Sequence, residues 1–133
     1  MIGEHGSGVR EITTPRAPSP GGAYSQGIIV NGFVFSAGCG PQDPITGVVI
    51  GDTIAAQTRQ VLSNISAILA EANSTLSEVV KVTAHLANPE RDFLEYDAVC
   101  RAIFSKPYPV RTTVGSCLVG MLVEIDVVAV VRP

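Results

Sequence analysis

Residues 121–131 read MLVEIDVVAVV and alternate between two kinds of side chain. A repeat of two residues is typical of a β-strand, because successive side chains point to opposite faces of a sheet. One face of the predicted strand is wholly apolar and consists of Met121, Val123, Ile125, Val127, Ala129 and Val131. That face needs a cover, and we expect helices from elsewhere in the chain to provide it.

The opposite face of this strand is half apolar. It carries Leu122, Glu124, Asp126, Val128 and Val130. A half-apolar face without helices is not expected to remain in water. We therefore predict that this face meets another subunit and that the protein is a homo-oligomer.

Other strands are indicated by alternating or short apolar runs bounded by turn residues. They are predicted at 28–30, 33–37, 80–86 and 110–117, and the pattern also admits a short strand at 11–14. Asn31-Gly32 between the first two runs is a strong signal for a β-hairpin. The connection between the last two strands, 118–121, is short.

Two amphipathic helices complete the pattern, because apolar residues recur every three or four positions in 53–72 and in 90–104. Asp52 is a suitable N-cap for the first helix, and Pro89 suits the first position of the second. The order β-β-α-β-α-β-β predicts an α/β (α+β) fold with a mixed sheet and both helices on one face. We expect a flexible N-terminal lead at 1–11 and a single domain at 12–133.

Composition narrows the classes of function. The 133 residues are 46% hydrophobic, and their formal charge is only -3, with no cluster of Lys or Arg to bind nucleic acid. The N-terminus lacks the apolar run of a signal peptide, so no membrane partner and a cytoplasmic location are predicted. No metal site is expected, because Cys39, Cys100 and Cys117 form no C-x-x-C pair, and His5 and His85 are isolated.

Arg111 and Glu124 are the first candidates for chemistry, because each is a charged residue within an apolar strand. Such residues are commonly solvated at an edge or paired with one another. If the last two strands form a plain hairpin, Glu124 lies three residues, or about 10 Å, along from Arg111. That gap could hold a small carboxylate, or it could put the two groups in different sites.

Other polar positions are weaker signals. Tyr24 could line a pocket or cover the core. Asp97 is interpreted first as a surface charge of the second helix. Gly38 and Gly40 do not open a helix as G-x-G-x-x-G would, so no dinucleotide site is indicated.

Several motifs occur in the order found in the RidA (YjgF) family of imine deaminases, and the chain resembles that family over roughly residues 12–131. The matching segments are Ala17-Pro18, GAYSQG (22–27), FSAG (35–38), DP-x-TG (43–47), AQTRQVL-x-N (56–64), VVKVT (79–83), PVRTTV (109–114) and VEID (123–126). Their order agrees with the order of predicted elements.

The resemblance implies a chorismate-mutase-like fold and a homotrimer with a central β-barrel. Its active sites would lie in clefts between neighbouring subunits. It also implies hydrolysis of 2-aminoacrylate-like enamines and imines to 2-keto acids and ammonia, without a metal or another cofactor.

Residue roles follow from the same resemblance. Arg111 matches the arginine that binds the substrate carboxylate, and Glu124 matches the glutamate that activates water. Tyr24 matches the tyrosine that closes the pocket. The substrate-binding positions implied in this way are Arg111, Tyr24, Thr113, Ala37, Gly38 and Asp97.

The chain also departs from the family pattern. Ala37 stands where Ser is frequent, Asp97 where Asn is frequent and Thr113 where Cys is frequent, and the loop at 118–121 is shorter. These changes suggest a different imine, such as 2-aminomuconate. The alternative is a non-catalytic trimer that binds small carboxylates or protects proteins. A function as a ribonuclease or translation inhibitor fits poorly, because the chain is acidic and lacks a pair of catalytic histidines.

Overall fold

The computed structural model describes residues 2–4 and 8–132. Its helices are α1 (Ile54–Glu71) and α2 (Pro89–Ile103), and a 3-10 helix, η1 (Leu76–Glu78), precedes the fifth strand. The strands are β1 (Ile2–Glu4), β2 (Arg10–Ile12), β3 (Gly27–Val30), β4 (Phe33–Ser36), β5 (Val79–Leu86), β6 (Val110–Gly115) and β7 (Val123–Val130).

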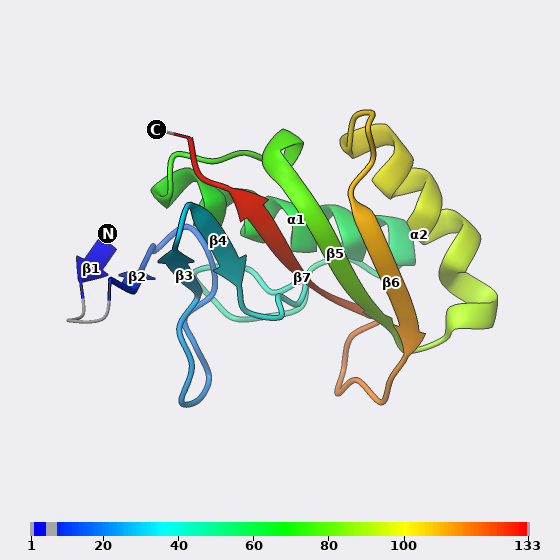
Figure 1. Cartoon of the computed structure of the whole chain (residues 1–133). Helices are drawn as coiled ribbons and strands as arrows, with labels where there is room; N and C mark the ends of the chain where they lie inside the picture. Colours follow the sequence, from blue (N-terminus) through cyan, green and yellow to red (C-terminus); the bar gives the residue numbers. More distant parts are fainter. Residues whose placement is uncertain (1, 5–7, 133) are drawn as a thin grey trace.

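The described strands form one mixed sheet in the order β1-β2-β3-β4-β7-β5-β6. Only β5 and β6 run parallel to each other among these neighbours; the other pairs are antiparallel. Both helices lie behind the sheet in Figure 1, α1 against β7 and β4 and α2 against β5. The predicted fold class, a mixed sheet with two helices on one face, is confirmed.

The core forms where β7 faces α1. Val123, Ile125, Val127 and Ala129 are each at most 1% exposed. They share one apolar cluster with residues of α1 that recur at helical spacing, namely Val61, Leu62, Ile65, Ile68 and Leu69. The apolar residues at every second position of β7 thus pack against the apolar residues at every third or fourth position of α1.

The turn predicted between the two strands of the hairpin is confirmed, but the predicted N-cap of α1 is not. β3 and β4 pair as the predicted hairpin, with φ of 50° at Asn31 and 79° at Gly32. The prediction of Asp52 as the N-cap of α1 was wrong. Thr53 takes that place, because its hydroxyl accepts a hydrogen bond from the backbone N–H of Ala56 at 3.1 Å.

The last two strands do not form the plain hairpin considered from the sequence. β5 lies between β6 and β7, and it pairs in parallel with β6 and antiparallel with β7. The reason is the helix: α2 carries the chain from β5 back to the same end of the sheet, so that β6 joins as a parallel neighbour. The estimated gap between Arg111 and Glu124 on a hairpin therefore does not apply.

The N-terminal strands extend the sheet beyond β3. The short strand expected at 11–14 is found at Arg10–Ile12, and β1 adds a further strand that was not predicted. His5 lies outside the described residues. The domain boundary proposed at residue 12 stays a prediction.

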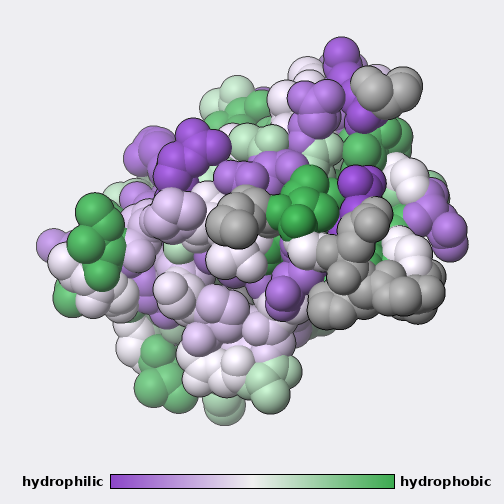
Figure 2. Space-filling view, turned by 90° about the vertical axis from the view of Figure 1, so that its left-hand side faces the viewer, coloured by the Kyte–Doolittle hydropathy of each residue, from purple (hydrophilic) through white to green (hydrophobic). Residues whose placement is uncertain are grey.

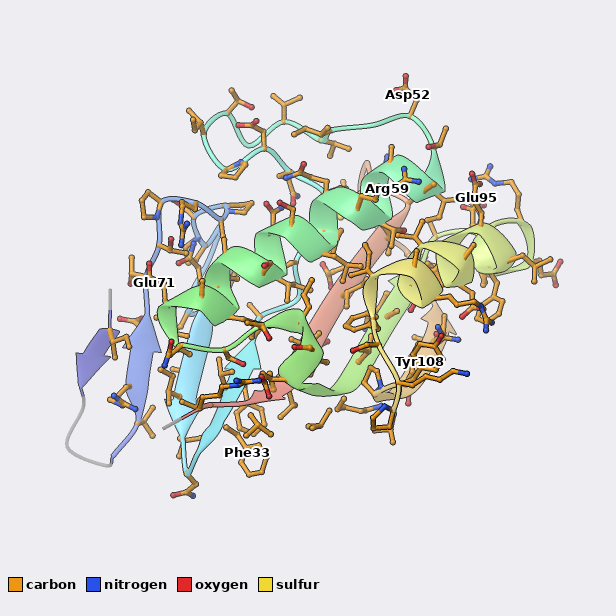
Figure 3. All side chains as sticks on the ribbon, turned by 90° about the horizontal axis from the view of Figure 1, so that it is seen from above. Phe33, Asp52, Arg59, Glu71, Glu95 and Tyr108 are labelled. Carbon is orange, nitrogen blue, oxygen red and sulfur yellow. The ribbon has the colours of Figure 1, made fainter. Side chains whose placement is uncertain are left out.

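The side of the sheet away from the helices, here called the open face, is uncovered in the single chain. Phe33 points away from the helices in Figure 3, and Phe33 and Phe35 are 41% and 44% exposed. Val130 pairs with Phe33 and is also exposed. Figure 2, which views the molecule from the β1 side, shows apolar side chains as separate small patches among polar ones.

Gln26 ties the segment before the hairpin to β3. The side chain is buried, and its Oε1 accepts from the N–H of Thr14 at 2.7 Å. Its Nε2 donates to the carbonyl oxygens of Thr14, Ala17 and Pro18 at 3.0, 3.2 and 2.9 Å. One amide therefore satisfies several backbone groups that would otherwise be buried without partners.

We expect Gln26→Ala to lower the free energy of unfolding by about 2 to 4 kcal/mol, because it leaves buried backbone groups without partners. Urea denaturation at one fixed protein concentration measures the change. Gln60→Ala is the control, since Gln60 is partly buried and donates a single side-chain hydrogen bond to Asn64. Equal effects of the two substitutions would contradict the assigned role of Gln26.

Candidate active site

The glutamate pocket is a cavity of about 500 Å³ beside the start of β7. Predicted site residues Tyr24, Ala37, Gly38 and Glu124 line it together, from segments far apart in sequence. Its other lining residues include Gln26, Cys39, Gly40, Gln42, Thr46 and Met121. Glu124 is the only acidic residue among the described lining residues, so the pocket presents one carboxylate in a mostly neutral wall.

Gly38 allows the carboxylate of Glu124 to lie directly over the backbone. A Cβ atom at position 38 would stand 2.8 Å from Oε2 of Glu124, closer than real Cβ contacts allow. The chain is fixed at this point because Cys39 and Ile125 exchange backbone hydrogen bonds of 2.8 and 3.0 Å. A side chain at position 38 would therefore have to displace the carboxylate.

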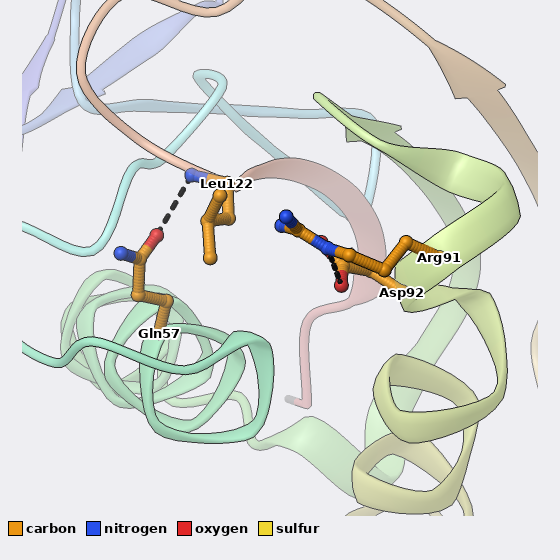
Figure 4. Close-up of polar contacts among 4 residues, drawn as sticks. All are labelled: Gln57, Arg91, Asp92 and Leu122. Atoms are coloured by element: carbon orange, nitrogen blue, oxygen red, sulfur yellow. Dashed lines mark hydrogen bonds and ion pairs between the residues drawn. The ribbon is translucent and has the colours of Figure 1, made fainter.

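Amide side chains of α1 hold the walls of the glutamate pocket. Nδ2 of Asn64 donates to the carbonyl oxygens of Gly40 and Gln42 at 3.1 and 2.9 Å. Oε1 of Gln57 accepts from the N–H of Leu122 at 2.8 Å, just before β7 (Figure 4). Both side chains are buried, so these bonds are shielded from water.

Tyr24 stands at the mouth of this pocket. Its hydroxyl accepts a hydrogen bond of 2.9 Å from the N–H of Gly21, and the residue is 54% exposed. Met121, from the short loop before β7, forms another part of the wall. The loop whose length departs from the family pattern therefore contributes directly to the shape of the pocket.

Burial raises the pKa of two groups that lie close to Glu124 in the sheet, Cys39 and Asp126. Burial raises the pKa of the Cys39 thiol to about 12, and Glu124 and Asp126 add to that rise. Cys39 is therefore a neutral thiol at physiological pH and a poor nucleophile. Burial also raises the pKa of Asp126, although His85 and Lys81 oppose the change.

A second cavity, the arginine pocket, has a volume of about 370 Å³ and lies between α2 and β6. It is lined by Val82, Asp97, Cys100, Arg101, Phe104, Tyr108, Pro109 and Arg111. Nη1 of Arg111 lies 2.7 Å from Oδ1 of Asp97. The guanidinium carbon also lies 5.4 Å from the ring centres of both Phe93 and Tyr96, so α2 holds this arginine by charge and by aromatic contact.

Arg111 and Glu124 are not brought together within one chain. Arg111 is the register partner of the buried Val82 and shares its face toward the helices. Glu124 is the partner of His85 and lies on the open face. The two side chains therefore point to opposite sides of the sheet, and they are three residues, or about 10 Å, apart along β5.

Of the remaining predicted positions, Asp97 lines the arginine pocket. Its side chain is 20% exposed and pairs with Arg111, so this charge on the surface of α2 is part of an ion pair. Thr113 shares the helix-side face of β6 with Arg111. Its Oγ1 is buried and has no hydrogen-bond partner among the described residues, and Thr113 lines neither pocket.

The residues that hold Arg111 and the walls of the glutamate pocket in place were not identified from the sequence. Phe93 and Tyr96 were assigned no role beside Arg111, although Phe93 and Asp97 lie four residues apart on one face of α2. Gln57 and Asn64 were not recognised as anchors of the pocket walls. The available signal was their position on the buried stripe of an otherwise apolar helix face.

Within residues 2–4 and 8–132, no helix has the length and apolar character needed to cross a membrane. No three His, Cys, Asp or Glu side chains gather there in a way that could hold a metal ion. The predictions that no metal and no cofactor take part stay predictions.

Comparison with known proteins identifies relatives over nearly the whole chain. The family model described as endoribonuclease L-PSP matches residues 14–131. A RutC family protein of Pyrococcus abyssi is 42% identical over 120 residues, which are 89% of this chain and 94% of that protein. The 2-iminobutanoate/2-iminopropanoate deaminase of Bos taurus is 33% identical over 92% of this chain and 90% of its own length.

Solved structures agree with these relatives. The crystal structure of RidA from the Antarctic bacterium Psychrobacter has a TM-score of 0.84 and is 35% identical, covering 90% of this chain and 97% of that one. Fold, sequence identity and the ordered motifs thus point the same way, and this chain belongs to the RidA (YjgF) family, whose model carries the description endoribonuclease L-PSP.

Proposed function

We propose that this protein is an enamine/imine deaminase that hydrolyses 2-aminoacrylate-like imines to 2-keto acids and ammonia. Family membership supports the reaction class, because a bovine relative is named as a deaminase of 2-iminobutanoate and 2-iminopropanoate. The observation that carries the proposal is the single carboxylate of Glu124, held over Gly38 in an open cavity. No metal or cofactor takes part in the proposed reaction, and the expected location is the cytoplasm.

Arg111 binds the substrate carboxylate in this proposal. A guanidinium fork can donate two parallel charge-assisted hydrogen bonds, which fix both the position and the orientation of a carboxylate. The rings of Phe93 and Tyr96, each centred 5.4 Å from the guanidinium carbon, restrict the movement of the fork. The arginine therefore acts as a rigid anchor and takes no proton.

Glu124 activates the water that attacks the imine carbon. As the new C–O bond forms, the carboxylate accepts a proton from the water, and the former C=N electron pair moves to nitrogen. Glu124 then returns the proton to the nitrogen of the tetrahedral adduct. The hydroxyl proton of the adduct then passes through Glu124 to the leaving nitrogen as the C=O bond forms and the C–N bond breaks, and ammonia leaves. The net change is the addition of one water molecule and the loss of one ammonia molecule.

The complete site is composed of two subunits. Because Arg111 and Glu124 face opposite sides of one sheet, a substrate that touches both must bind between the arginine pocket of one chain and the glutamate pocket of the next. A closed homotrimer provides three equivalent clefts of this kind. The partly apolar open face, with Phe33, Phe35 and Val130, supplies the surface that neighbouring chains would bury.

The walls of the glutamate pocket bear on the size of the imine. Ala37 and Met121 line the glutamate pocket, and both lie where this chain departs from the common pattern. Tyr24 closes the pocket at its exposed mouth. A bulkier imine such as 2-aminomuconate is therefore the next substrate to test, and saturable binding of keto acids without turnover would instead favour a non-catalytic carboxylate-binding protein.

We expect Glu124→Gln to lower kcat for 2-aminoacrylate, generated in situ by a serine dehydratase, by about 10² to 10⁴, because the general base is lost. Arg111→Ala should lower kcat/KM by a factor on the order of 10², since charge-assisted bonds to the carboxylate are lost. Release of keto acid measures both. Glu95→Gln and Arg59→Ala remove exposed charges on α2 and α1 as controls. Full activity of either active-site variant would refute its role.

Mixed trimers test whether two chains build one site. Arg111→Ala and Glu124→Gln chains are unfolded together, refolded together and assayed. A cleft that receives its intact Arg111 from one chain and its intact Glu124 from the other should recover activity, up to about a quarter of the wild-type value for random mixing. Each variant refolded alone is the control. Mixtures that remain as inactive as the separate variants would contradict the shared site.

The assembly itself is measured by light scattering. We expect a particle of about three times the 13.9 kDa mass of the chain, because the open face is too apolar to remain in water. Phe33→Asp, at the exposed apolar end of that face, should shift the protein toward smaller species. A stable wild-type monomer at micromolar concentration would exclude the trimer.

A further inference from the structure

Asp97 lies between two arginines in the arginine pocket. Its Oδ1 is 2.7 Å from Nη1 of Arg111, and its Oδ2 is 2.9 Å from Nη2 of Arg101. All three residues line the cavity. The carboxylate is therefore part of the wall that faces a ligand.

The two arginines are held very differently. The side chain of Arg111 is 28% exposed and is packed against aromatic rings, whereas that of Arg101 is 66% exposed. Exposed ion pairs four residues apart on a helix contribute little and exchange readily with water. Oδ1 of Asp97 is thus bound to a fixed partner, and Oδ2 is bound to one that is easily displaced.

The carboxyl group of Asp97 is ionised at neutral pH. The hydrogen bond from Arg111 lowers the pKa of this carboxyl below its usual value, and Arg101 adds to the effect although partial burial opposes it. Asp97 is also the only acid among the described residues that line the cavity. The pocket therefore offers a fixed cation and a fixed anion side by side.

A fixed pair of this kind matches a ligand with both charges on neighbouring atoms. A guanidinium has five N–H donors, and the bond to Asp97 uses Nη1, so other donors are available to a carboxylate. A cationic nitrogen on the next carbon of the ligand would then lie near Asp97. A ligand with a carboxylate alone would instead meet the negative charge of Asp97.

Resting on the proposed function, we infer that Asp97 is a specificity-determining residue that binds the cationic nitrogen of a 2-iminium carboxylate, while Arg111 binds the carboxylate of the same molecule. The nitrogen replaces Arg101 at Oδ2. The substrate class is thus the zwitterionic, protonated imine rather than a simple keto acid. The keto acid product has lost the nitrogen, so it loses this contact and leaves more easily.

Stable analogues allow the inference to be tested without turnover. L-2-Aminobutanoate carries the zwitterionic pattern, and 2-oxobutanoate has the same carbon skeleton with a keto group in place of the ammonium. Isothermal titration calorimetry at pH 7 gives the Kd of each for the assembled wild-type protein and for Asp97→Asn, Asp97→Ala and Arg111→Ala. Glu95→Gln is the matched control, because Glu95 is an exposed acid on the same helix (Figure 3).

The readout is the ratio of the Kd of 2-oxobutanoate to the Kd of L-2-aminobutanoate. We expect Asp97→Asn and Asp97→Ala to lower this ratio by about tenfold or more, because a charge-assisted contact to the ammonium is lost and the repulsion of a lone carboxylate is relieved. Glu95→Gln should leave it within about twofold. A merely structural role of Asp97 in orienting Arg111 would weaken both ligands and leave the ratio unchanged.

Arg111→Ala separates a failure of the role of Asp97 from a failure of the carboxylate anchor. An unchanged ratio in both neutral Asp97 variants, with both ligands lost in Arg111→Ala, would overturn the inference and leave the proposed carboxylate anchor intact. Binding of both ligands that is as strong in Arg111→Ala as in the wild type would instead remove the carboxylate anchor and so contradict the proposed function itself.

Discussion

The alternation of side chains along β7 sets the position of both the core and the candidate site. Val123, Ile125 and Val127 are buried against α1, so the strand has only one register in which its apolar residues leave water. A shift by one residue would bury Glu124 and Asp126 under the helix, which is prohibitive for ionised groups. The same alternation therefore sets both the core and the side on which the carboxylates lie.

The sheet separates the two charged residues of the candidate site. Its helix side holds Arg111 among aromatic rings, and its open side holds Glu124 over a glycine. Neither cavity is lined by both Arg111 and Glu124. Since side chains cannot pass through a hydrogen-bonded sheet, a reaction that needs both groups requires a second copy of the chain. Oligomerisation would thus be part of the proposed site and would also cover the open face.

Buried polar side chains hold the irregular segments around the glutamate pocket in place. Gln26, Gln57 and Asn64 use amide groups to hold irregular segments against regular ones. Such segments cannot satisfy their own backbone groups, and a buried amide supplies a donor and an acceptor together. In the arginine pocket, Asp97 pairs with the guanidinium of Arg111. The two opposite charges form a fixed dipole at the proposed ligand site.

Both helices, the strands from β2 to β7, the buried face of β7, the hairpin at Asn31-Gly32 and the motifs of the family could be predicted from the sequence alone. These properties depend on the two-residue and 3.6-residue periods and on local turn chemistry, which a sequence displays directly. Tertiary structure alone decided that β5 separates β6 from β7, that Arg111 and Glu124 face apart, and that Asp97 pairs with Arg111. Strand neighbours and ion pairs arise from contacts between distant segments, whose free energies depend on the whole packed arrangement and leave no period in the sequence.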